Sequence, residues 1–111
     1  MMKIAMSSAA STLLRAIVAR AAVDRNRILL TDAHSTDWQS LTFTGERHQL
    51  SLKVTGSNSG EIVERICAGL GDAEFSIPGV LVADIAAVGS PRLGSEGATE
   101  LVIEALTISE D

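Results

Sequence analysis

The chain has few aromatic residues and a single cysteine. Its 111 residues include one Trp, two Phe and no Tyr, so aliphatic side chains must build the core. The exposed aromatics on which single-stranded nucleic acids stack are correspondingly scarce. The lone cysteine, Cys67, excludes an internal disulfide framework. Free thiols are typical of a reducing compartment, so the sequence predicts a cytoplasmic location.

Clustered positive charge and long apolar runs are also missing. Nine Lys and Arg stand against fourteen Asp and Glu, which gives a net charge of −5, whereas proteins that bind phosphate backbones carry clustered cations. No apolar run approaches the roughly 20 residues that cross a bilayer. Residues 1–23 have the acid-poor composition of an organellar transit peptide, although an ordinary first helix is the favoured interpretation. We therefore predict neither a nucleic-acid partner nor a membrane partner.

Motifs that carry chemistry are missing as well. No serine stands in a nucleophile-elbow pattern, and no set of Cys and His has the spacing of metal ligands. The glycine-rich stretch at 89–97, GSPRLGSEG, lacks the Gly-Lys-Ser/Thr ending of a phosphate-binding loop. The sequence therefore predicts no metal and no cofactor. It leaves the 89–97 stretch as either an ordinary hairpin loop or a place of ligand contact.

What is present is a clear apolar pattern in one domain that spans residues 1–111. A first helix begins at Ser7 or Ser8 and runs to about residue 23, and a second begins at Asn58 with Glu61 in capping-box spacing and ends at Gly71. Alternation and short apolar runs predict strands at 27–33, 38–44, 48–55, 73–88 and 99–108. We predict an α+β two-layer sandwich, with two helices on one face of a five-stranded, mostly antiparallel, ferredoxin-like sheet. A helix-first meander and a permuted ferredoxin-like order both fit this pattern.

The pair Gly45-Glu46 predicts a two-residue turn that sets the register of the central hairpin. Glycine in first place suits a type II′ turn, and this turn pairs Phe43 with His48 across the two strands. Extending the pairing to strand 27–33 places His48 and His34 at opposite ends of the sheet, roughly 20 Å apart at ~3.3 Å per residue. One metal ion could not then bind both imidazoles within a single chain.

Three residues are candidates for ligand contact: Arg47, His48 and Arg92. An imidazole titrates near neutral pH, so His48 could act as a general base, although a His that caps the core beside Phe43 is the favoured interpretation. Arg47 is interpreted as a turn corner beside His48, and Arg92 is the one Arg of the 89–97 stretch. Asp84 interrupts an apolar run, and an outward carboxylate is favoured there over a buried one with a raised pKa.

Part of the second half of the chain resembles PII-type signalling proteins. EIVERI, IPGVLVADIAAV and PRLGSEG follow one another here as a helix, a strand and an Arg-containing loop do in that family. The match covers under half of the chain. The stretch SIPG at 76–79 stands where the family has Gly-Asp-Gly-Lys, so the nucleotide-contacting Lys has no counterpart. The resemblance implies a ferredoxin-like fold, trimerisation through sheet faces and a regulatory role, but not nucleotide binding.

The outward face of the predicted hairpin carries Trp38 among polar residues such as Gln49 and Lys53. It is either a solvated surface or a sheet-to-sheet oligomer interface, since Trp is enriched at interfaces. We predict a small, non-catalytic domain that forms a homo-oligomer and acts as a binding or regulatory module, with a small molecule as an open candidate for its ligand. The alternative is a small enzyme with an acid/base site around His48.

Overall fold

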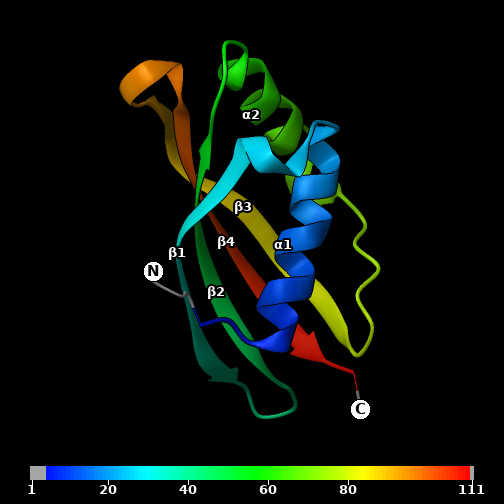
Figure 1. The fold of residues 1–111 in the computed structure, drawn as a ribbon. Helices are drawn as coiled ribbons and strands as arrows, with labels where there is room; N and C mark the ends of the chain where they lie inside the picture. Colours follow the sequence, from blue (N-terminus) through cyan, green and yellow to red (C-terminus); the bar gives the residue numbers. More distant parts are fainter. Residues whose placement is uncertain (1–4, 111) are drawn as a thin grey trace.

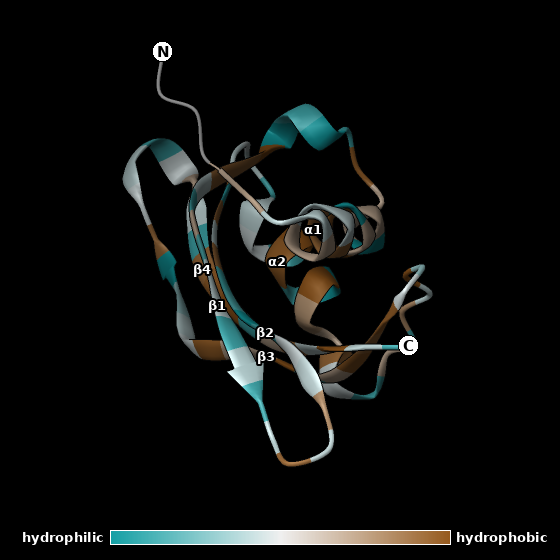
Figure 2. Cartoon of the chain, turned by 90° about the horizontal axis from the view of Figure 1, so that it is seen from below, coloured by the Kyte–Doolittle hydropathy of each residue, from teal (hydrophilic) through white to brown (hydrophobic). Residues whose placement is uncertain are grey.

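The computed structural model describes residues 5–110, in which two α-helices pack on one face of a four-stranded antiparallel sheet (Figure 1). Figure 2 shows that the sheet curves around the helices, which lie on its concave side. Neither described helix is long and apolar enough to span a membrane. The elements follow in the order α1 (Ser8–Ala21), η1 (Arg25–Arg27), β1 (Ile28–Gln39), β2 (Thr44–Val54), α2 (Ser59–Cys67), η2 (Leu70–Asp72), β3 (Val80–Leu93), η3 (Ser95–Gly97) and β4 (Thr99–Ser109).

The order of strands across the sheet is β1-β2-β4-β3, and every neighbouring pair is antiparallel. The last strand therefore lies between β2 and β3, which excludes a simple meander. The prediction of five strands is wrong, because the described chain forms four strands. The observed element order α-β-β-α-β-β becomes the ferredoxin-like order β-α-β-β-α-β when β4 is placed before α1, so the chain adopts the permuted order, the second of the two predicted alternatives. The two-layer arrangement, with both helices on one face, is nevertheless present.

The first hairpin turns earlier in the chain than the sequence predicted. Ser40 donates its backbone N–H to the Phe43 carbonyl at 2.8 Å. The Ser40 hydroxyl also accepts from the amides of Thr42 at 3.3 Å and Phe43 at 3.0 Å. This local hydrogen bonding by a serine side chain favours a turn, and it leaves Gly45 and Glu46 inside β2. The prediction of a turn at Gly45-Glu46 is therefore wrong.

A register shift explains why the sequence pattern predicts two separate strands, 27–33 and 38–44, where the structure has the single strand β1 as far as Gln39. Ile28 and Leu30 face the helices, and after the irregularity between Leu30 and Asp32 the inward positions become Ala33 and Ser35. A bulge adds one residue to its strand and so reverses the alternation beyond it. The sequence pattern consequently loses its period of two near residue 31, although the strand continues to Gln39.

The third strand also differs from its predicted bounds. Residues 73–79 are not a strand, although Phe75 and Ile77 pack on the core, and β3 begins after Gly79, whose φ of 81° makes the turn. Strand β3 then continues through residues 89–93, which were predicted to be loop. A second irregularity, between Val88 and Arg92, allows the ladder with β4 to continue there.

Helix α1 has the predicted N-terminal cap, whereas α2 begins at the predicted place without the predicted cap bond. The Ser7 hydroxyl accepts from the Ala10 amide at 3.2 Å, which is an N-cap bond. Asn58 makes no such bond to α2, because its side-chain oxygen accepts from the Arg27 guanidinium at 2.7 Å. Gly69, rather than Gly71, adopts the left-handed conformation after α2, with φ 62°.

Two arginines tie the C-terminal ends of the helices together. Arg20 of α1 donates to the carbonyls of Ile66, at 3.1 Å, and Ala68, while Arg65 of α2 donates to the carbonyl of Ala21. Each guanidinium thus satisfies carbonyls that a helix end leaves without partners. The core beneath is aliphatic, as the composition predicted: its most deeply buried members are Leu13, Ile17, Leu50, Leu52, Val54, Ile62, Ile66 and Ile103.

Candidate interaction face

His48, the first sequence-predicted contact residue, lies in the core of the protein. Its side chain is only 2 % exposed, its Nδ1 lies 2.7 Å from the Ser35 hydroxyl and its Nε2 lies 2.8 Å from the Thr107 hydroxyl. Burial lowers the pKa of His48 below its usual value, and nearby Glu46 offsets part of that effect. A neutral imidazole with both nitrogens occupied is a satisfied core group, and it offers a substrate no accessible nitrogen in this conformation.

The other two predicted contact residues lie on the opposite side of the sheet. Arg47 is the neighbour of His48 along β2, so its exposed side chain points away from the helices. Arg92 is exposed on β3 and lies 3.6 Å from the Glu100 carboxylate. The structure therefore does not gather Arg47, His48 and Arg92 into one site. Asp84, on β3, is exposed, which confirms the outward orientation expected for it.

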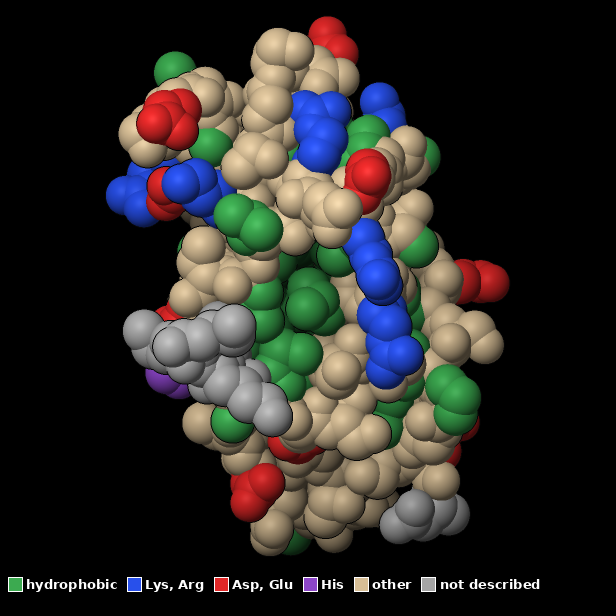
Figure 3. Space-filling model, viewed as in Figure 1, with side chains coloured by type: hydrophobic (Ala, Val, Ile, Leu, Met, Phe, Trp, Pro, Cys, Tyr) green, Lys and Arg blue, Asp and Glu red, His purple; other side chains and the backbone are tan. Residues whose placement is uncertain are grey.

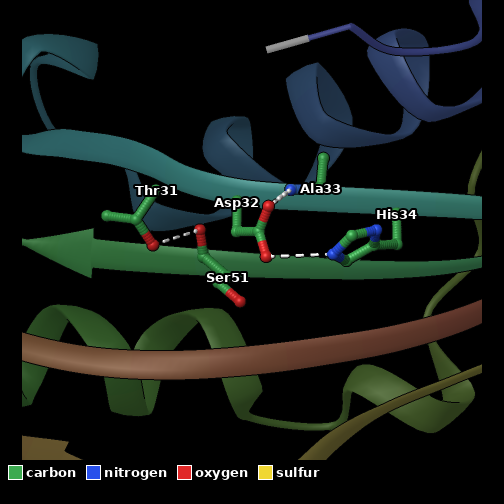
Figure 4. A network of polar contacts seen from close by, with 5 residues as sticks. All are labelled: Thr31, Asp32, Ala33, His34 and Ser51. Atoms are coloured by element: carbon green, nitrogen blue, oxygen red, sulfur yellow. Dashed lines mark hydrogen bonds and ion pairs between the residues drawn. The ribbon is translucent and has the colours of Figure 1, made fainter. Parts of the chain in front are cut away.

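The predicted separation of the two histidines along the sheet is wrong. The observed register pairs Ser35 with His48 and His34 with Gln49, so the imidazoles occupy successive positions and point to opposite faces. His34 forms an exposed ion pair with Asp32, its Nε2 lying 3.1 Å from Oδ2, and the other carboxylate oxygen of Asp32 accepts from the Ala33 amide (Figure 4). Among residues 5–110 no third metal-ligating side chain joins them. The pair is a solvated contact along one strand.

The sheet surface that faces away from the helices is covered by no other described element, and we call it the open face. Residues that oppose each other across an antiparallel ladder share a face, so the register and the burial pattern define its members. These are Leu29, Asp32, His34, Thr36 and Trp38 of β1; Arg47, Gln49, Ser51 and Lys53 of β2; Glu100, Val102, Glu104, Leu106 and Ile108 of β4; and Leu81, Asp84, Ala86, Val88 and Arg92 of β3.

Opposite charges run side by side along the middle of the open face. Strand β2 contributes Arg47 and Lys53, and strand β4 contributes Glu100 and Glu104. Lys53 and Glu100 are direct cross-strand partners. The face thus has a basic stripe beside an acidic one, and this arrangement is a property of the strand order. The alternation Thr99-Glu100-Leu101 along 99–108 signalled that the glutamates point outward, but not that β4 lies next to β2.

The two ends of the open face differ in polarity. At one end Trp38 pairs with Gly45, which in turn pairs with Ile108, and Ile108 pairs with the half-exposed Leu81. These side chains form an apolar corner. Towards the other end the face is hollowed into a cavity of about 400 Å³, whose polar lining comes from Thr31, Asp32, Ser51, Ser90, Arg92 and Glu100. There the Thr31 hydroxyl of β1 donates a hydrogen bond to the Ser51 carbonyl of β2 at 3.1 Å (Figure 4).

The open face is large and mixed in composition. It combines one Trp, several aliphatic side chains and complementary charges, the composition that distinguishes interface cores and rims. No protein-family model matches the chain, and no curated protein is significantly similar to it.

Proposed function

We propose that the protein is a non-catalytic binding or regulatory module that associates with a second copy of itself through the open face. The observation that carries this proposal is the pairing of Lys53 on β2 with Glu100 on β4 across the open face. A two-fold axis parallel to the strands, between β2 and β4, would lay β2 of one copy over β4 of its partner. In such a symmetric interface every contact occurs twice: if one residue of the first copy touches a second residue of the partner, the second residue of the first copy touches the first residue of the partner.

The register predicts which residues meet. Because the axis runs along the strands, each residue faces the partner's residue of the same cross-strand row. Lys53 would lie over the partner's Glu100, and Gln49 over the partner's Glu104. Packed sheets cross at about 30°, which displaces pairs far from the axis more than pairs near it. Pairs on the two central strands are therefore the most reliable contacts for a test.

The apolar corner is compatible with the same rotation. Trp38 on the outer strand β1 would lie over the partner's Leu81 on β3, and Ile108 would lie over the partner's Gly45. The absence of a side chain at Gly45 leaves room for the larger aliphatic group. Burial of Trp38 would supply the aromatic anchor that commonly dominates the affinity of an interface.

The size of the face predicts a weak, reversible pair. Four strands spaced ~4.8 Å apart, each contributing about ten residues at ~3.3 Å, cover roughly 600 Å² per copy. A total near 1,200 Å² lies at the lower limit of specific interfaces. We therefore expect association that depends on concentration. A cytoplasmic setting is part of the proposal, because the single cysteine, Cys67, is a free thiol, which is typical of a reducing compartment.

A charge-reversal series tests the proposal. Light scattering at a series of concentrations should show a mass above 11.6 kDa that falls to the monomer value in Lys53→Glu and in Glu100→Lys. The double variant Lys53→Glu/Glu100→Lys should restore association, because it exchanges the two charges. Glu61→Lys, on the exposed side of α2, is the matched control and should associate normally.

The single variants should still fold, since opposite charges on neighbouring strands of an open sheet surface contribute at most about 1 kcal/mol, and thermal melts would check this. Trp38→Asp should also dissociate the pair. Two results would contradict the proposal: a wild-type protein that stays monomeric up to several hundred micromolar, or a double variant that associates no better than the single variants.

A further inference from the structure

We propose that the groove between α1 and the start of β1 binds an amphipathic anion, specifically a single-chain molecule with a carboxylate head such as a long-chain fatty acid. The groove lies where α1 meets the edge strand β1, at the border between the helix layer and the open face, to which Leu29 also belongs. Its volume is about 560 Å³, within the range of roughly 300–1,000 Å³ that is usual for small-molecule sites.

The walls of the groove are aliphatic. Leu14 and Val18 project from successive turns of α1, Val23 follows the helix, and Leu29, which is 46 % exposed, forms the β1 side. Figure 3 shows hydrophobic side chains lining a hollow beside a column of Lys and Arg side chains that lies over α1. An apolar chain laid along this hollow would remove these side chains from water.

Two arginines at the groove supply the charge. Arg15 and Arg25 both line it, and neither makes an ion pair or a side-chain hydrogen bond within residues 5–110. The neighbouring arginines Arg20 and Arg27 are instead engaged with backbone carbonyls. In a chain of net charge −5, two unengaged guanidiniums beside an apolar groove are an unusual concentration of positive charge.

No acid of α1 offsets these arginines. Helix α1 contains no Asp or Glu, and Asp24, which precedes Arg25 in the sequence, uses its carboxylate to accept from the Asn26 amide at 2.9 Å. A guanidinium binds a carboxylate through two parallel N–H···O bonds, so a carboxylate head matches both the sign and the geometry of this rim.

The extent of the groove favours a small amphiphile over a protein. Nine residues line it, whereas a stable protein–protein interface uses about 20–30 residues on each side. A partner protein would have to extend well beyond the groove to bury an interface of that size. A flexible chain with one charged end requires no more than the groove and its two arginines.

Titration calorimetry and ¹H–¹⁵N spectra with sodium dodecanoate below its micellar concentration test the proposal. Dodecanoate should bind the full-length protein at one site and shift amide signals of Leu14, Val18 and Leu29. Dodecanol and dodecyltrimethylammonium, which match the chain length, should bind at least about tenfold more weakly, since a charge-assisted contact of this kind is worth about a factor of ten. Arg15→Gln/Arg25→Gln should weaken dodecanoate binding by a similar factor and leave dodecanol binding unchanged.

The control is Arg92→Gln, which removes an exposed arginine from the other face and should leave dodecanoate binding unaltered. Equal binding of dodecanoate and dodecyltrimethylammonium would overturn the proposal. So would signal shifts spread over every exposed apolar residue, which would indicate non-specific adsorption. If Arg15→Gln/Arg25→Gln lowered the mass of the assembly and left dodecanoate binding unchanged, the groove would be a contact with a second copy and the proposal would be wrong.

Discussion

Gly45 allows the sharpest test of the packing between β2 and β4. Its backbone lies in β2, and a Cβ atom added there would be 1.9 Å from the Thr107 carbonyl oxygen and 3.0 Å from the Ile108 Cα atom. Both obstacles are backbone atoms of β4, so no side-chain rotation can relieve the contact. We predict that Gly45→Ala strongly destabilises the protein by forcing the two strands apart at this end of the ladder.

The magnitude follows from the distance. A carbon–oxygen contact is comfortable at about 3.3 Å, so β4 would have to retreat by roughly 1.4 Å, which breaks the hydrogen bonds of the last one or two residue pairs. Overpacking costs about 1–3 kcal/mol, and each lost hydrogen bond adds about 1 kcal/mol. Because the end of the strand can fray, the loss of stability is smaller than the full sum of these costs. We expect a loss of about 2–4 kcal/mol from a stability of about 5–15 kcal/mol, or about 10 °C or more in melting temperature.

The matched control is the same substitution at Gly60. That residue lies in α2, has no heavy atom within 4 Å of an added Cβ, and does not have a positive φ. Gly60→Ala should therefore raise the free energy of unfolding by about 0.5–1 kcal/mol, because alanine favours the helix. Urea denaturation of the wild type and both variants measures these changes. A Gly45→Ala variant within about 0.5 kcal/mol of the wild type would refute the packing argument.

Two further predictions concern buried polar contacts. Since burial lowers the pKa of His48 in the folded state, the unfolded chain binds more protons, and stability should be complete above about pH 7.5 and decline as pH falls through 6.5 towards the folded value. Urea melts across this pH range should show that the free energy of unfolding of His48→Gln no longer declines as pH falls, whereas that of His34→Gln still does. A decline that persists in His48→Gln and disappears in His34→Gln would contradict the argument. Arg20→Ala and Arg65→Ala should each cost about 1 kcal/mol through their unsatisfied carbonyls, with Arg15→Ala nearly neutral as the control, and equal stability of all three variants would argue against these helix-end contacts.

The inward positions of β2 could be predicted because they alternate without interruption. His48, Leu50, Leu52 and Val54 all face the helices, in the phase that the apolar pattern indicated. The partner strand could not be aligned with them, because the bulge after Leu30 reverses its phase and local hydrogen bonding moves the turn to residues 40–43. A pattern of period two reports which side of a strand faces the core, but it carries no information about an extra residue in the strand beside it.

The predicted contact residues also divide into features that one strand predicts and features that depend on its neighbours. That Arg47 and His48 point to opposite faces follows from their adjacency in one strand, so they could not form a single cluster in any register. The partners of His48 lie thirteen and fifty-nine positions away, at Ser35 and Thr107, and no local pattern announces them. The hydroxyls that satisfy the imidazole could be identified only when the strands were placed side by side.

The sequence by itself determined the aliphatic core, the two amphipathic helices and the inward phase of each uninterrupted strand, because these depend on contacts within a few residues along the chain. Only the tertiary structure decided the strand order β1-β2-β4-β3, and with it the basic and acidic stripes of the open face. It also decided the structural role of Gly45. The residue that suggested a turn instead lies where the backbone of β4 leaves no room for a Cβ atom on β2. A glycine can mark either a bend in its own strand or the proximity of another backbone.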